Sequence, residues 1–145
     1  MEFQIRPLVQ WVTNSVQPLV DAPMSNDPYP KEILERLTFY LRNCVILVPW
    51  MGTTKDQIGG KFETVGGCEI HTDGRYYWQY DAADYLEHYP IRIDEEALEY
   101  FISIDWRPPS FGQFDPIKYA MREAYDSYSD DNFPADGIIT VHYEP

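Results

Sequence analysis

An Asp-Gly pair between two β-prone runs constrains the fold more than any other feature of this sequence. The runs Cys68–His71 and Arg75–Gln79 flank Thr72-Asp73-Gly74. A short Asp-Gly turn between runs of β-branched and aromatic residues is a strong signal for an antiparallel β-hairpin. We therefore expect a sheet that contains this hairpin, and the remaining segments must supply the layers that cover the sheet.

Five segments show the spacing of apolar residues that is typical of amphipathic helices. The clearest follows Pro30, where Ile33, Leu37 and Leu41 fall on one side. A weaker helix is expected over about Pro7 to Val16. The other three are expected over Ala82–Tyr89 with Asp81 as the cap, after Asp94 with Leu98, Phe101 and Ile102 as the buried stripe, and from Pro116 to about Tyr128.

Three further segments are expected to be strands. The apolar run Cys44–Trp50 favours a strand that is buried on both faces and central in the sheet. A weak strand near Lys61–Val65 and a closing strand at Ile138–Tyr143 complete the set. The prediction is a single α+β domain, a small and largely antiparallel sheet covered by three or four helices. Residues 1–29 would form an N-terminal segment and linker, and residues 30–145 the main body.

Charge excludes one large class of function. The chain has 145 residues, which fits one domain, and 24 acidic against 11 basic residues give a net charge of −13. This balance argues against nucleic-acid binding, because a protein that binds the phosphate backbone needs a basic surface. Most of the excess lies in residues 69–145, so we expect the C-terminal half to steer or bind a partner.

The sequence also suggests where the protein resides. It has no run of 18 or more apolar residues, and its first seven residues lack the layout of a signal peptide. We therefore expect a cytoplasmic protein that does not bind membranes. Cys44 and Cys68 are expected to be free thiols that pack in the interior.

No motif predicts a cofactor, a metal or a catalytic residue. Asp126, Asp130, Asp131 and Asp136 lack the spacing of a calcium loop, and His71, His88 and His142 lie on separate predicted elements. No serine stands in a Gly-x-Ser-x-Gly motif, and the glycine pairs match no phosphate-binding pattern. Paired carboxylates for glycoside chemistry stay open, because 24 acids always offer some pair at a suitable distance.

Aromatic and acidic residues alternate between Asp73 and Tyr100. On the predicted strand Arg75–Gln79, Tyr76 and Trp78 share one face and Tyr77 lies on the other, so we expect one face in the core and one exposed. Large rings are enriched at protein interfaces, and carboxylates beside them would complement a basic partner. The alternative is that the rings belong to the core and the acids are a solvated surface.

The segment Thr72-Asp73-Gly74-Arg75-Tyr76-Tyr77-Trp78 resembles a motif of small bacterial proteins, Thr-Asp-Gly-x-Trp-x-Trp. In that group a helix with a Tyr-x-x-x-Tyr core follows, as at Tyr85 and Tyr89, and Trp50-Met51-Gly52 with Asp56 is similar to its upstream part. Tyr76, Gln79 and Asp94 replace a Trp and two Pro residues of the pattern. Many such proteins are immunity proteins of bacterial polymorphic toxin and contact-dependent inhibition systems. The resemblance covers residues 44 to 101, and it assigns no residue to toxin contacts.

The resemblance and the charge together suggest a non-enzymatic immunity protein that neutralises a cognate toxin domain. The toxin would be basic and nuclease-like, and acidic and aromatic side chains would cover its active site. Two alternatives stay open: a small enzyme or ligand-binding domain with a carboxylate-lined pocket, and an acidic adaptor or nucleic-acid mimic. The expected partner-binding residues are Tyr77, Tyr80, Asp84, Glu87, Glu95, Glu96 and Glu99.

Overall fold

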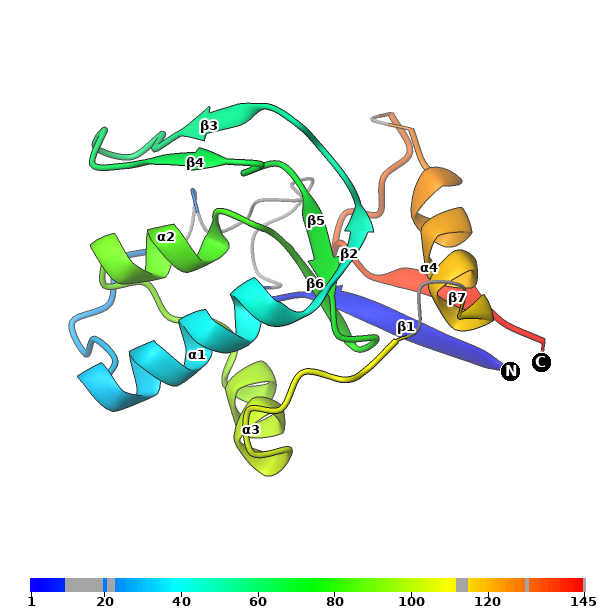
Figure 1. Cartoon of the computed structure of the whole chain (residues 1–145), viewed down its shortest axis with the longest axis horizontal. Coiled ribbons are helices and arrows are strands. Elements are labelled where there is room, and N and C mark those ends of the chain that lie inside the picture. Colours follow the sequence, from blue (N-terminus) through cyan, green and yellow to red (C-terminus); the bar gives the residue numbers. More distant parts are fainter. Residues whose placement is uncertain (10–19, 21–22, 112–114, 130, 145) are drawn as a thin grey trace.

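The computed structural model describes residues 1–9, 20, 23–111, 115–129 and 131–144, and these form an α+β fold (Figure 1). A mixed five-stranded sheet has the strand order β2-β5-β6-β1-β7, and a separate two-stranded sheet pairs β3 with β4. The elements in chain order are β1 (Glu2–Pro7), α1 (Lys31–Asn43), β2 (Val45–Val48), β3 (Thr53–Lys55), β4 (Glu63–Val65), β5 (Ile70–Thr72), β6 (Tyr76–Gln79), α2 (Ala82–His88), α3 (Glu95–Ser103), α4 (Pro116–Asp126) and β7 (Ile139–His142).

The predicted hairpin is confirmed as β5 and β6, which pair antiparallel. Its turn is closed by the two polar side chains of the Thr-Asp-Gly motif. The Thr72 hydroxyl donates to the carbonyl of Tyr76 at 2.6 Å, and Asp73 Oδ1 accepts from the N–H groups of Arg75 at 2.8 Å and Tyr76 at 2.6 Å. Gly74 has φ +88°, a conformation that glycine adopts without steric cost. The motif residues therefore hold the turn together.

The first strand was not expected from the sequence. β1 lies inside the sheet, parallel to β6 and antiparallel to β7. The predicted helix over Pro7–Val16 is wrong at its start, because Pro7 ends β1, and its residues 10–16 lie outside the described part of the chain. A parallel neighbour that is distant in sequence leaves no local signal, which is why apolar spacing alone did not identify this strand.

The strand predicted in Cys44–Trp50 exists as β2, but its expected central position is wrong. β2 is an edge strand, and Ile46 is 39% exposed. Leu47, by contrast, is buried beneath α4 together with Met121. A continuous apolar run shows that a strand has apolar residues on both sides, but it does not say how many neighbouring strands pair with it.

Both faces of β6 are covered, which corrects the expectation of one exposed face. Tyr76 and Trp78 pack into a core cluster with residues of α1, α2 and α3, whereas Tyr77 packs into a second cluster with Met121 of α4. Figure 1 shows α4 on one side of the sheet and the other three helices on the opposite side. Alternation along the strand thus separates two cores.

The remaining predicted helices and strands are present, with changes in detail. Ile102 is 49% exposed and does not belong to the buried stripe of α3, which consists of Ala97, Leu98 and Phe101. Asp81 precedes α2, but its side chain accepts from the Thr54 hydroxyl at 2.9 Å and does not cap the helix. The weak strand is confirmed as β4 and the closing strand as β7. Among the described residues, no helix is long and apolar enough to cross a membrane.

Candidate partner-binding surface

Tyr77 is not a surface residue. Its side chain is 1% exposed, and its hydroxyl donates to the carbonyl of Gly137 at 2.6 Å. Burial raises the pKa of this phenol above its usual range. Tyr77 was expected to contact a partner, and that expectation is wrong because α4 covers this face of the sheet.

Tyr80 is half-buried, and its ring stacks on His71 with the ring centres 4.9 Å apart. The His71 ring is itself held at both nitrogens. Nδ1 lies 2.9 Å from the carbonyl oxygen of Cys44, and Nε2 lies 2.9 Å from the carboxylate of Glu69. These two contacts fix the orientation of the His71 ring beneath Tyr80. Tyr80 therefore covers a hydrogen-bonded His71–Glu69 pair and offers only part of its ring to a partner.

Asp84 and Glu87 are paired with one cation within the protein. Arg42 of α1 lies 3.1 Å from Asp84 and 2.5 Å from Glu87, and the Thr64 hydroxyl also donates to Asp84 at 2.7 Å. These contacts join α2 to α1 and to β4. The two carboxylates were expected to contact a basic partner, but they already share the guanidinium of Arg42 as an ion-pair partner.

The remaining three predicted acids form an exposed group, which we call the α3 acidic surface: Glu95, Glu96 and Glu99. In the described part of the chain no lysine or arginine forms an ion pair with any of them. Glu95, Glu99 and the exposed Ile102 follow one another at helical spacing, so they lie on one side of α3. In Figure 1, α1 separates α3 from α2, so the structure divides the predicted acids between two surfaces.

An apolar pocket lies immediately after α3, and we call it the Trp106 pocket. Phe39 of α1, Trp106 and Pro108 form its apolar lining, Glu35, Arg36, Asp105 and Arg107 its charged lining, and its volume is about 440 Å³. Phe39 is 59% exposed. Trp106-Arg107-Pro108-Pro109 lies between the helices predicted after Asp94 and from Pro116, and a tryptophan close to two prolines is the sequence signal that could have indicated a fixed, ring-lined loop.

The backbone at this pocket adopts an unusual conformation. Asp105 and Trp106 both have positive φ, 55° and 57°, and neither is a glycine. Each such residue costs roughly 1–2 kcal/mol relative to an ordinary conformation. The turn lets the N–H of Trp106 donate to the carbonyl of Phe101 at 2.9 Å and brings the indole against the Phe101 ring. The pocket is therefore built at a cost that the packing of Trp106 offsets.

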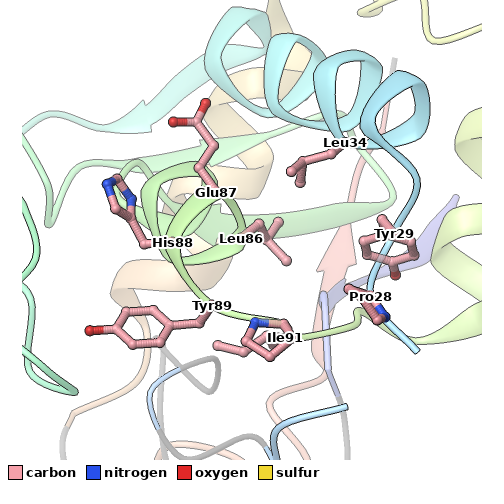
Figure 2. A pocket seen from close by; sticks show the side chains of 9 residues that line it. Pro28, Tyr29, Leu34, Leu86, Glu87, His88, Tyr89 and Ile91 are labelled. Carbon is pink, nitrogen blue, oxygen red and sulfur yellow. The ribbon is translucent and has the colours of Figure 1, made fainter. Parts of the chain in front are cut away.

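A second pocket, shown in Figure 2, lies between α1 and the end of α2. Tyr29, Leu34, Leu86 and Ile91 line it, and its volume is about 210 Å³, below the range of roughly 300–1,000 Å³ that is typical of ligand sites. Its one carboxylate, Glu87, is the one held by Arg42. His88 also lines this pocket, and its Nδ1 lies 2.8 Å from the carbonyl oxygen of Asp84.

The contacts of the Asp56 carboxylate are structural. Its oxygens accept from the N–H groups of Ile58 at 2.8 Å, Gly59 at 3.3 Å and Lys61 at 2.7 Å, and from the Tyr89 hydroxyl. Burial by itself raises the pKa of Asp56, but these hydrogen bonds outweigh it and lower the pKa to about 2. Asp56 thus holds the β3–β4 loop against α2.

For the Asp73 carboxylate, burial outweighs the hydrogen bonds, so its pKa is raised. The Tyr40 hydroxyl and backbone N–H groups bind the carboxylate. Neither Asp56 nor Asp73 lines the Trp106 pocket, the pocket of Figure 2 or the groove beside β7 described below. The arrangement expected of a carboxylate enzyme, a shifted pKa inside a pocket, is not found at these three sites.

The predicted ligand-type residues stay apart as well. Within the described residues, no three His, Cys, Asp or Glu side chains come together as metal ligands do. Asp126 pairs with Arg122, Asp136 accepts from the N–H of Ile138, and Asp130 lies outside the described residues. Both cysteines are free thiols as predicted. Cys44 is buried, and burial raises its pKa to about 12.

Comparisons with known proteins identified no relative of this chain. The chain was compared with protein-family models, with curated proteins and with solved structures, and none of them matches it.

Proposed function

We propose that this protein is a non-enzymatic immunity protein that binds a basic toxin domain through the α3 acidic surface and the Trp106 pocket. The observation that carries the proposal is the group of three exposed carboxylates on α3, for which the described part of the chain supplies no ion-pair partner. The resemblance of residues 44–101 to immunity proteins supports the choice of partner.

The position of Glu99 shows that the helix dipole does not account for all three acids of the α3 acidic surface. Glu95 and Glu96 stand in the first turn of α3, where the helix dipole favours anions. Glu99 lies one turn further on and faces Glu95 at i,i+4, an arrangement that is mildly unfavourable for like charges. A basic partner would remove that repulsion.

The Trp106 pocket offers an apolar contact, which the charges of the α3 acidic surface do not provide. Binding energy at interfaces is concentrated in a few apolar anchors that fill pockets, whereas charges mainly raise the association rate and set specificity. Phe39 and Trp106 offer such a pocket next to the C-terminal end of α3, and two acids and two arginines complete its lining. A basic partner with one apolar side chain at the contact would use both features.

The net charge of −13 suits this role. An inhibitor must bind before its toxin does damage, and electrostatic steering can raise association rates by about two to three orders of magnitude above those of neutral pairs. The surplus of acids thus favours fast capture of a basic domain.

The test measures binding to the domain that is encoded immediately upstream of this protein's gene. Association rates would be measured for the wild type and for the triple variant Glu95→Gln, Glu96→Gln, Glu99→Gln, at about 50 mM and about 500 mM salt. The matched control removes three exposed carboxylates elsewhere, by Glu63→Gln, Asp131→Asn and Glu144→Gln.

We expect the α3 variant to associate about tenfold more slowly at low salt and to lose most of its salt dependence. The control, which has the same net charge, should remain within about twofold of the wild type. Equal effects of the two variants would show that only total charge matters and would overturn the assignment of the surface. A complete lack of complex formation by the wild type would overturn the proposed function.

A further inference from the structure

The outer edge of β7 presents unpaired backbone groups. Among the residues that the structure describes, β7 pairs with β1 alone, and Tyr143 donates its N–H to the carbonyl of Met1 at 2.8 Å. In an antiparallel ladder alternate residues face the partner strand. Ile139 and Val141, two and four residues before Tyr143, therefore turn their N–H and C=O groups toward β1. Thr140 and His142 turn theirs toward the open edge.

A groove runs along this edge between β7 and α4, which lie side by side in Figure 1. Its volume is about 340 Å³. The side chains of Ile139 and Val141 pack with Met121 of α4, so the side chains of Thr140 and His142 lie on the other face of the strand. On the α4 side, Thr140 and His142 therefore present their backbone N–H and C=O groups. The opposite wall carries Ala120 and Ala124 of α4 and Ser127 just after it, whose small side chains leave the space open, and Tyr128 lies beyond them.

The two edge strands of the five-stranded sheet, β2 and β7, differ in how their outer edges are protected against pairing with another chain. At β2 the strand is interrupted by an irregularity between Ile46 and Val48, and the carbonyl of Leu47 accepts from Arg122 at 3.4 Å. Such devices protect an edge against pairing with another chain. β7 has neither a bulge nor a lysine or proline in its four residues. Within the described part of the chain, β7 is therefore the edge strand that can extend the five-stranded sheet.

We propose that an extended segment of a partner protein binds in this groove and adds a strand to the sheet beside β7. Main-chain hydrogen bonds to Thr140 and His142 would hold the segment, and the small residues of α4 would accommodate its side chains. The carboxylate that lines the groove is Glu123, and no lysine or arginine lines it. The segment therefore carries a lysine or arginine opposite Glu123.

Charge disfavours a second copy of this chain as the occupant. Two chains of net charge −13 repel each other, and a symmetric pairing would place a second acidic groove beside the first. The site lies on the opposite side of the sheet from α3, so it does not depend on the α3 acidic surface and goes beyond the proposed function.

The test selects binders from a library of random nine-residue peptides displayed on phage, with counter-selection on Thr140→Pro. Proline removes the outward N–H of Thr140 without removing a hydrogen bond to β1, and proline is tolerated at strand edges for that reason. Thr140→Val is the matched control, since it changes the side chain and keeps the N–H. Thermal unfolding would confirm that both variants are folded.

We expect the selected peptides to alternate β-branched residues with lysine or arginine. The best of them should bind Thr140→Pro at least about tenfold more weakly than the wild type, and Thr140→Val within about twofold. Glu123→Gln should weaken binding by about two- to fivefold. In hydrogen exchange, the amides of Thr140 and His142 should be fast in the free protein and protected once the peptide is bound.

A second form of the test leaves the protein unchanged, in case Thr140→Pro fails to fold. The selected peptide is made with alternate amides N-methylated, in both registers, and one register should abolish binding. Failure to enrich peptides, or equal binding of both methylated forms, would overturn strand addition. Concentration-dependent dimers that protect Thr140 and His142 would overturn the choice of occupant and assign the edge to a second copy. The α3 variant should bind the peptide normally, so failure here is distinct from failure of the proposed function.

Discussion

The hydroxyl of Tyr40 in α1 donates a 2.5 Å hydrogen bond to the carboxylate of Asp73, 33 residues further along the chain. Both side chains are buried, and Asp73 at the same time closes the turn between β5 and β6. One contact thus couples a helix to the hairpin at the centre of the fold. It explains why an aspartate of a surface-type turn motif lies in the interior.

Tyr40→Phe should lower the free energy of unfolding by about 1–3 kcal/mol. The substitution keeps the ring and leaves one oxygen of the buried Asp73 carboxylate without its donor, which is costlier than the loss of an exposed hydrogen bond. Urea unfolding measures the change. Tyr119→Phe is the matched control, because Tyr119 is 55% exposed, and it should have almost no effect. Similar losses in both variants would contradict a special role for the Tyr40–Asp73 contact.

Asp56 should make stability depend on pH under acidic conditions. Its folded-state pKa of about 2 lies below the ordinary aspartate value of about 3.9, so its contribution is fully present above the ordinary value. The contribution is lost as the pH falls from about 4 through about 2. Urea unfolding of the wild type and Asp56→Asn across this range should show a gap of about 1–3 kcal/mol near neutral pH that closes in acid. Tyr89→Phe, which removes one of the four donors, should give an intermediate curve, and a gap that is constant with pH would refute the assignment.

Arg42→Met should lower the free energy of unfolding by about 1 kcal/mol, because it leaves Asp84 and Glu87 without their half-buried partner. Added salt should reduce the loss, since screening weakens the repulsion between the two carboxylates. The control is Lys31→Met, whose 3.9 Å contact with Glu35 is fully at the surface. If the control is equally destabilising, the pairing of Arg42 contributes nothing particular.

Asp105→Gly should raise the free energy of unfolding by about 0.5–1 kcal/mol, because glycine relieves the positive φ at this position. Asp105→Ala removes the same charge and keeps the strain, so it should bring no gain. Midpoints of urea unfolding compare the two variants. Equal shifts would mean that the exposed ion pair with Arg107, and not the backbone, determines the result.

The sequence by itself determined the local elements. The Asp-Gly turn predicted β5 and β6, and apolar spacing predicted α1, α2, α3 and α4 close to their observed bounds. These features depend on residues within a few positions of one another, through turn geometry, helical periodicity and the alternation of side chains along a strand. That is why a single sequence was sufficient for them and for the α+β class.

Only the tertiary structure decided which surfaces are available. Tyr77 and Tyr76 are neighbours on one strand, yet α4 buries the first and α3 the second. Asp84 and Glu99 have the same charge and similar helical settings, yet Arg42 neutralises one and not the other. Pairing between strands and contacts between helices join residues that are far apart in the sequence, and their free energy depends on the packing of the whole chain. For that physical reason the α3 acidic surface and the open edge of β7 emerge only from the folded molecule.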